Sequence, residues 1–227
     1  MDTEALPDIR ILDHALDHAP LPHFLIDDGC WLGDAAALEA AVLPSQDESR
    51  ACALLEMGAP RIYLGEAALL DSGVVARLVA RYGSDRIGVY APCRRMEVSW
   101  SLETKSNADF KVVTPSICEP TWEVLLADGT PTGTIASWWL GAMIAFGAGS
   151  ALLRADIGDD TDLNICAGLM ETYGKRLWLS PLSRAPHSFG DWVRWGKATR
   201  LAVDRATYEA RDDVRALAAA PQIREAA

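Results

Sequence analysis

Several signatures of common protein classes are missing from these 227 residues. The five cysteines form no Cys-x-x-Cys pair and are odd in number, which argues against a disulfide framework and against a zinc knuckle. Positive charge is scarce, with 21 Lys and Arg against 32 Asp and Glu, a formal net charge of -11. A nucleic-acid groove needs a dense cationic track, and an anionic membrane attracts basic segments. We therefore expect no nucleic acid and no membrane among the partners, and reduced thiols.

An export signal is also missing, because the first ten residues lack a basic start and an apolar core. This favours a cytoplasmic protein. The uncharged run at residues 134–153 has nearly the length of a membrane span. Gly147-Ala-Gly interrupts it, so we expect a buried helix that ends there, followed by a strand over Ser150–Leu153. No Gly-x-Gly-x-x-Gly follows a predicted strand, so no dinucleotide is indicated, and no other cofactor is predicted.

What the chain does contain is enough apolar sequence for one large core, with 50% hydrophobic and 23% charged residues. Past residue 40, short apolar runs alternate with amphipathic segments that end at a glycine, a pattern typical of strands joined by helical crossovers. With Ile9–Leu12 as the first strand, the runs predict an α/β fold, a closed (β/α)8 barrel in one domain over residues 1–227. His14–Pro22 is too short for a crossover helix, so the N-terminal end should be irregular. The other predicted strands are Phe24–Asp27, Ala41–Leu43, Ile62–Gly65, Ile87–Tyr90, Leu152–Asp156, Leu177–Ser180 and Leu201–Val203.

Residues 96–134 break this rhythm with three runs of β type, Met96–Trp100, Phe110–Thr114 and Trp122–Leu126. We expect an inserted β-ribbon after the fifth strand, over the C-terminal mouth where barrel enzymes place their sites. Trp100 and Trp122 belong to this ribbon. They fit two roles equally well, a stacking lid over a planar ring or a contact with a protein partner or a second copy of the chain.

Four stretches of the chain carry a family resemblance. Glu56-Met-Gly-Ala-Pro-Arg-Ile-Tyr-Leu-Gly-Glu and Arg81-Tyr-Gly-Ser-Asp-Arg-Ile-Gly-Val resemble the HisA/HisF family of histidine biosynthesis. Trp122-Glu-Val-Leu-Leu-Ala-Asp-Gly-Thr-Pro-Thr-Gly and Phe146-Gly-Ala-Gly-Ser-Ala-Leu-Leu look like its cyclase branch. The resemblance covers residues 45–210. It implies a barrel related to the phosphoribosylformimino aminoimidazole carboxamide ribotide isomerase and to the imidazole glycerol phosphate synthase cyclase.

The positions that carry the chemistry of that family differ here. Pro92 stands where the family has the catalytic aspartate of its fifth strand, and a proline cannot exchange a proton. In the phosphate-binding turns, Glu66 follows Gly65 in place of a small hydroxyl residue, and Ser180-Pro181-Leu182 replaces Ser-Gly-Gly. Asp204 replaces a glycine after the eighth strand. Proline removes an N–H donor and carboxylates repel a dianion, so we expect a ligand with little or no phosphate.

Three carboxylates follow predicted barrel strands and should therefore meet at one mouth, namely those of Glu66, Asp156 and Asp204. Crowded carboxylates suit proton transfer or a cationic ligand, although Asp at such a turn also caps the next helix. The segment Ala155-Asp-Ile-Gly-Asp-Asp160 resembles the family's Thr-Asp-Ile-x-x-Asp-Gly, so Asp156 is the best catalytic candidate, with Glu66 beside it. The predicted ligand-binding residues are Gly65, Trp122, Asp160, Ser180 and Asp204.

Other candidates have weaker signals. His187 follows the seventh strand and is a third catalytic candidate if it overhangs the mouth. Cys93 precedes two arginines, which either lower the pKa of its thiol or support the ribbon, the second being favoured. His14 and His18 share a helical face, but Ala15 stands where the zinc-protease motif needs a glutamate, so no metal site is predicted.

Three functions remain open. The first is a repurposed isomerase-like or lyase-like barrel enzyme for a small ring-containing metabolite, placed by family association in one-carbon cofactor metabolism, that of tetrahydromethanopterin or methanofuran. The second is a ribotide isomerase or cyclase of histidine biosynthesis. The third is a barrel without catalysis that binds a protein partner through its ribbon and its acidic first 60 residues.

Overall fold

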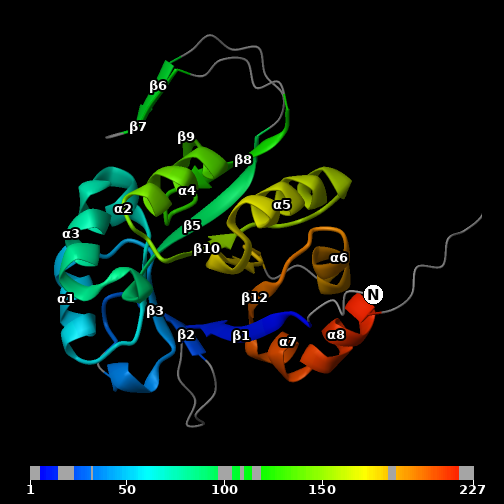
Figure 1. The fold of residues 1–227 in the computed structure, drawn as a ribbon, viewed down its shortest axis with the longest axis horizontal. Helices are drawn as coiled ribbons and strands as arrows, with labels where there is room; N and C mark the ends of the chain where they lie inside the picture. Colours follow the sequence, from blue (N-terminus) through cyan, green and yellow to red (C-terminus); the bar gives the residue numbers. More distant parts are fainter. Residues whose placement is uncertain are drawn as a thin grey trace, which may run out of the picture.

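The computed structural model describes residues 6–14, 23–31, 33–96, 104–107, 110–113, 119–183 and 188–219. Among these residues, eight parallel strands pair side by side, and the pairing of β10 with β5 closes them into a barrel (Figure 1). The predicted (β/α)8 fold is thus confirmed. Around the barrel the strands are β1 (Asp8–Asp13), β2 (His23–Ile26), β3 (Ala40–Leu43), β4 (Ile62–Leu64), β5 (Ile87–Met96), β10 (Ser150–Arg154), β11 (Leu177–Ser180) and β12 (Arg200–Val203).

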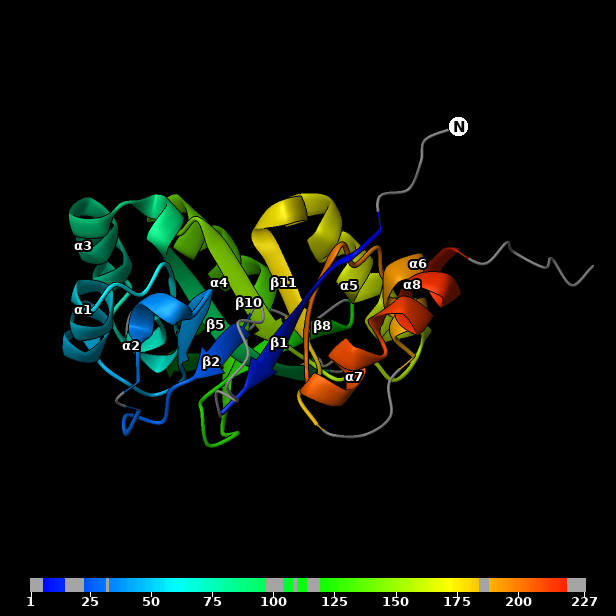
Figure 2. The same cartoon turned by 90° about the horizontal axis from the view of Figure 1, so that it is seen from below.

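Helices cover the outside of the barrel (Figure 2). Local signals set their ends: the Asp47 side chain caps the first helix by accepting the N–H of Arg50. Gly147 follows another helix with φ of 103°, a conformation that side chains disfavour. The helices are α1 (Glu48–Glu56), α2 (Glu66–Leu70), α3 (Gly73–Tyr82), α4 (Ala136–Ala145), α5 (Asp160–Tyr173), α6 (Phe189–Arg194), α7 (Arg205–Glu209) and α8 (Arg211–Ala219).

The first third of the barrel has short connections where the structure describes them. Between β2 and β3 the described residues contain a single three-residue 3-10 helix, η1 (Ala35–Ala37). The connection between β1 and β2 lies mostly outside the described residues. Among the described residues, the first full helical crossover is α1, after β3.

The core has two layers, one inside the barrel and one between the strands and the helices. Inside, the ring centroid of Phe24 lies 5.5 Å from that of Tyr63 and 5.0 Å from that of Trp178. The Tyr63 hydroxyl finds a partner in the Ser150 hydroxyl at 3.2 Å. A Cβ at position 88 would lie 2.6 Å from the Tyr63 ring, so Gly88 is what allows this ring to fill the barrel. The interior is therefore packed and leaves only the ends of the barrel for a ligand.

The region after β5 forms further β-structure. β5 continues beyond the barrel and pairs antiparallel with β8 (Thr121–Leu125), which pairs with β9 (Pro131–Ile135). A second pair, β6 (Thr104–Asn107) and β7 (Phe110–Val113), projects away from the barrel in Figure 1. The uncharged run that follows contains α4 and then β10, as its glycines predicted. No described helix is both long and apolar enough to cross a membrane.

Candidate functional site

The carboxyl ends of the eight strands meet at one end of the barrel, which we call the mouth. Side chains alternate along a strand, so Arg154 shares the inward face of β10 with Leu152, a member of the inner core layer. The strand register places Arg154 beside Pro92 of β5 on one side and Ser180 of β11 on the other. These three residues form the inner rim of the mouth.

Arg154 is held by the loop that follows β11. Its Nε donates to the carbonyl oxygen of Pro181 at 3.0 Å, and its Nη2 donates to that of Leu182 at 3.2 Å. Tyr90, which is 5% exposed, lies on the inward face of β5. Burial raises the pKa of the Tyr90 hydroxyl, and the charge of the nearby Arg154 opposes this rise. The mouth thus contains a cation beside a buried phenol.

Arg154 and Tyr90 are not among the site residues predicted from the sequence, because the predicted strand extends to Asp156 and places that residue at the mouth. The alternation Ser150-Ala-Leu-Leu-Arg154 contained the missing signal, because it places the arginine on the same face as Leu152.

Asp156, the first catalytic candidate, binds the same loop from its other side. Its Oδ1 accepts the backbone N–H of Leu182 at 3.0 Å and that of Ser183 at 2.9 Å. In phosphate-binding barrels, N–H groups of the loop after the seventh strand face the ligand. Here an aspartate of the chain itself takes two of them.

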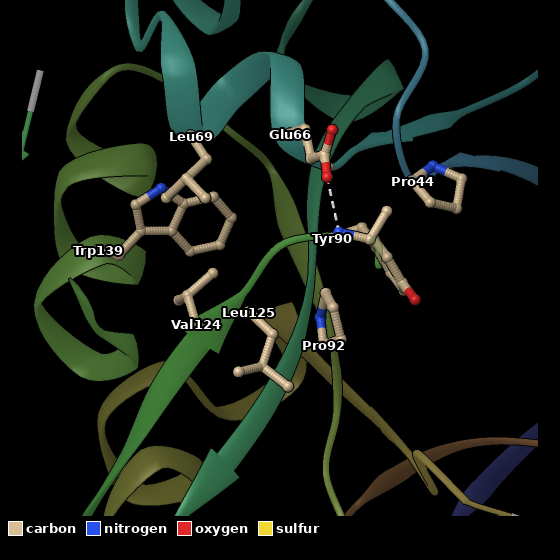
Figure 3. Close-up of a pocket in the computed structure, with 10 residues that line it drawn as sticks. Pro44, Glu66, Leu69, Tyr90, Pro92, Val124, Leu125 and Trp139 are labelled. Atoms are coloured by element: carbon tan, nitrogen blue, oxygen red, sulfur yellow. Dashed lines mark hydrogen bonds between the residues drawn. The ribbon is translucent and has the colours of Figure 1, made fainter. Parts of the chain in front are cut away.

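Glu66, the second candidate, joins β4 to the extended sheet. Its Oε1 accepts the backbone N–H of Ala127 at 2.7 Å, in the turn after β8 (Figure 3). The crevice beside it, lined by Tyr90 among others, is too narrow to admit a water molecule. A Cβ on Gly65 would lie 2.3 Å from the Pro44 carbonyl oxygen, so this glycine allows a close backbone contact. Both residues have structural contacts of their own.

The remaining predicted ligand-binding residues lie at separate places on the mouth. Asp204 caps α7, because its Oδ1 accepts the Thr207 N–H at 2.8 Å. Asp160 is the exposed first residue of α5, and Ser180 is buried on β11 with 2% exposure. Glu66, Asp156 and Asp204 therefore each bind a different backbone segment, and only Asp204 caps the helix that follows it, as the alternative raised from the sequence expects.

The base of the extended sheet is held by ion pairs. Arg94 Nε lies 2.7 Å from Glu123 Oε1, and Arg95 Nη1 lies 2.7 Å from Asp159 Oδ1. Cys93, on the same strand, is fully buried, and burial raises the pKa of its thiol. The hypothesis of an activated thiol is thus wrong, and the arginines support the extended sheet instead.

Trp122 is 1% exposed and its indole N–H donates to Asp162 Oδ1 at 3.1 Å. It packs in the outer core layer beneath α4 and α5, away from the barrel interior. His18, Trp100 and His187 lie outside the described residues. Within the part of the chain that the structure describes, no three His, Cys, Asp or Glu side chains gather as metal ligands would.

Neither a family model nor a curated protein matches this chain. Among solved structures, the phosphoribosyl anthranilate isomerase from Thermococcus kodakaraensis is similar, with a TM-score of 0.53 and 14% sequence identity. The match covers 92% of this chain and 98% of that one. At this identity it shows the shared barrel fold, and the HisA/HisF resemblance is supported only as far as that fold.

Proposed function

We propose that this chain is a divergent isomerase-like barrel enzyme, distantly related to the HisA/HisF barrels, whose mouth binds a small ring-containing metabolite without phosphate. One observation carries the proposal: Asp156 Oδ1 accepts the N–H groups of Leu182 and Ser183. A phosphate in that loop would need those donors, and the carboxylate would also repel it.

A second place for phosphate is closed in the same manner. In barrels with this ligand, the helix that follows the eighth strand contributes its N-terminus. Here the Asp204 carboxylate occupies the start of α7 and accepts the Thr207 N–H. Two anions of the chain thus stand where a substrate dianion would bind. The apolar and aromatic residues of the rim and floor, Pro92 and Tyr90, suit a planar ring instead.

The direct test compares ligands and one variant in a thermal-shift assay. The panel contains inorganic phosphate, ribose 5-phosphate and unphosphorylated pterins and furans, the rings of the one-carbon cofactors named above. An unphosphorylated ring at 100 times its Kd should stabilise the wild type by about 2.7 kcal/mol, and phosphate should have no effect.

Asp156→Ala should lose about 2 kcal/mol of unfolding free energy, because two N–H bonds to a charged acceptor disappear, and it should gain stabilisation by phosphate. Asp160→Ala is the control, because Asp160 is exposed and is the first residue of α5, whereas Asp159 is the residue that caps this helix. Stabilisation of the wild type by ribose 5-phosphate, or rescue of a histidine auxotroph, would contradict the proposal. If no ring compound stabilised the wild type, this would also contradict the proposal and would favour a protein-binding barrel.

A further inference from the structure

Arg154 differs from the other charged residues of the mouth in how its charge is balanced. Its partners, the carbonyl oxygens of Pro181 and Leu182 and the hydroxyl of Tyr90, are neutral. Among the residues that the structure describes, no carboxylate forms an ion pair with it. Asp156 is two residues away in sequence, but its Oδ1 is bound to N–H groups of the loop. A partly buried guanidinium without a counter-ion is costly unless an anion from outside completes it.

One edge of the guanidinium does not bind the loop, and the Tyr90 hydroxyl lies beside the guanidinium. Nε and Nη2 together form the side edge, and both donate to the loop after β11. Nη1 and the second N–H of Nη2 form the other edge, a fork that matches the two oxygens of a carboxylate. Because the loop carbonyls hold the side edge, the fork is positioned before a ligand arrives, which reduces the entropy cost of binding.

We propose that this mouth binds the carboxylate of a planar ring compound on Arg154, with the ring against Tyr90 and Pro92. The inference rests on the proposed function and names the substrate class of that same site. Pro92 lies directly beside Arg154 in the strand register, and Tyr90 is two residues before Pro92 on the inward face of β5. An apolar rim next to a single cation fits an aromatic monoanion.

The charges around Arg154 also exclude a second negative charge on the ligand. Arg154 supplies one positive charge, while Asp156 and Asp204 place two negative ones at the same end of the barrel. A monoanion is balanced by the arginine alone, whereas a phosphate dianion is left with an excess that the two aspartates repel.

The experiment measures Kd by titration calorimetry for matched pairs of probes. The acids are 2-furoate and pterin-6-carboxylate, each compared with its primary amide, and inorganic phosphate is titrated separately. The variants are Arg154→Gln, which removes the charge and the fork, and Arg154→Lys, which keeps the charge alone.

A matched control lies at the opposite end of the barrel. Arg86 is likewise held by backbone carbonyls, with Nη2 2.7 Å from the Ala59 oxygen and 3.1 Å from the Leu55 oxygen. Arg86→Gln therefore removes the same kind of contact far from the mouth. Urea unfolding of each variant without ligand separates a loosened loop from a lost binding group.

The wild type and Arg86→Gln should bind the acids at least tenfold more tightly than the amides. Arg154→Gln should lose at least this tenfold, about 1.4 kcal/mol, for the acids only, and Arg154→Lys should lose less. Equal binding of acids and amides, unchanged in Arg154→Gln, would overturn the inference and leave the proposed function intact. Binding of phosphate alone, or of no ring probe at all, would overturn both.

Discussion

The two halves of the mouth handle charge in opposite ways. In the half built from β1 to β4, Asp27 is fully buried after β2, and Arg50 of α1 pairs with it at 2.6 Å. Nη2 of the same arginine donates to the Trp31 carbonyl oxygen at 2.6 Å. In the half built from β5 to β12, Asp156 binds backbone N–H groups and Arg154 binds backbone carbonyls. At the end of β2 the opposite charges meet, whereas at the end of β10 Arg154 and Asp156 bind separate groups of one loop, although ion pairs such as Arg95–Asp159 hold the extended sheet in the same half.

This difference separates support from binding. The members of an ion pair neutralise each other and attract a further ion only weakly, and the Asp27–Arg50 pair joins α1 to the end of β2. When a cation and an anion each bind neutral backbone groups, neither charge is neutralised, so each can still attract a ligand of opposite charge. The second half is therefore where a charged ligand finds a partner, although both halves have carboxylates at their strand ends.

The largest expected effect tests the ion pair. Asp27→Ala leaves the Arg50 charge without its partner near the core and should lower the unfolding free energy by about 3–5 kcal/mol. Urea unfolding measures this loss. Asp28→Ala is the control, because Asp28 is exposed and its carboxylate accepts the N–H of Cys30. Binding of ring acids should be unchanged in both variants, and weaker binding in Asp27→Ala would mean that the first half also serves the ligand.

The buried cysteine thiols of the second half predict how the stability of the protein changes at alkaline pH. Cys93 of β5 and Cys166 of α5 are buried, whereas Cys30 is exposed and Cys52 is half-buried. Burial raises the pKa of the Cys93 thiol and raises that of Cys166 to about 12, from an ordinary 9.0. The unfolded thiols ionise first, so the stability that the neutral buried thiols contribute is complete below pH 9 and is lost as the pH rises from about 9 toward 12.

At pH 10 the loss should reach about 1.4 kcal/mol for each buried thiol relative to pH 8. Urea unfolding at both pH values should show a smaller decline in Cys93→Ala/Cys166→Ala than in the wild type. Cys30→Ala, at an exposed position, should decline as the wild type does. The decline, and not the absolute stability, is compared, because cavities lower stability at every pH. Equal declines in all three proteins would contradict the assigned burial.

The fold could be predicted from the sequence because its signals are local. Apolar runs of strand length recur between amphipathic segments, and glycines such as Gly83 and Gly147 follow the helices with positive φ. These patterns identified the strands of the barrel, including those of the first third. They also predicted that the uncharged run at residues 134–153 divides into α4 and β10.

The candidate site could be predicted only in part, because its contacts join distant segments. Asp156 does lie at the mouth, but its partners Leu182 and Ser183 are 26 and 27 residues away. Trp122 has the residue type of a lid, yet α4 and α5 cover the extended sheet and bury the ring. No periodicity reports which face of an inserted strand will be covered, or which backbone N–H a carboxylate will reach.

The smallest expected effect tests whether helix caps behave alike in the two halves. Asp204 caps α7 in the second half and Asp47 caps α1 in the first, each through one backbone N–H. Asp204→Ala and Asp47→Ala should each lower the unfolding free energy by about 1 kcal/mol in urea, because each loses one capping bond. Equal costs with unchanged binding of ring acids would confine the difference between the halves to the Arg154 and Asp156 loop. Weaker binding in Asp204→Ala alone would restore Asp204 as the ligand-binding residue that the sequence predicted, and would extend the charged part of the site from β10 to β12.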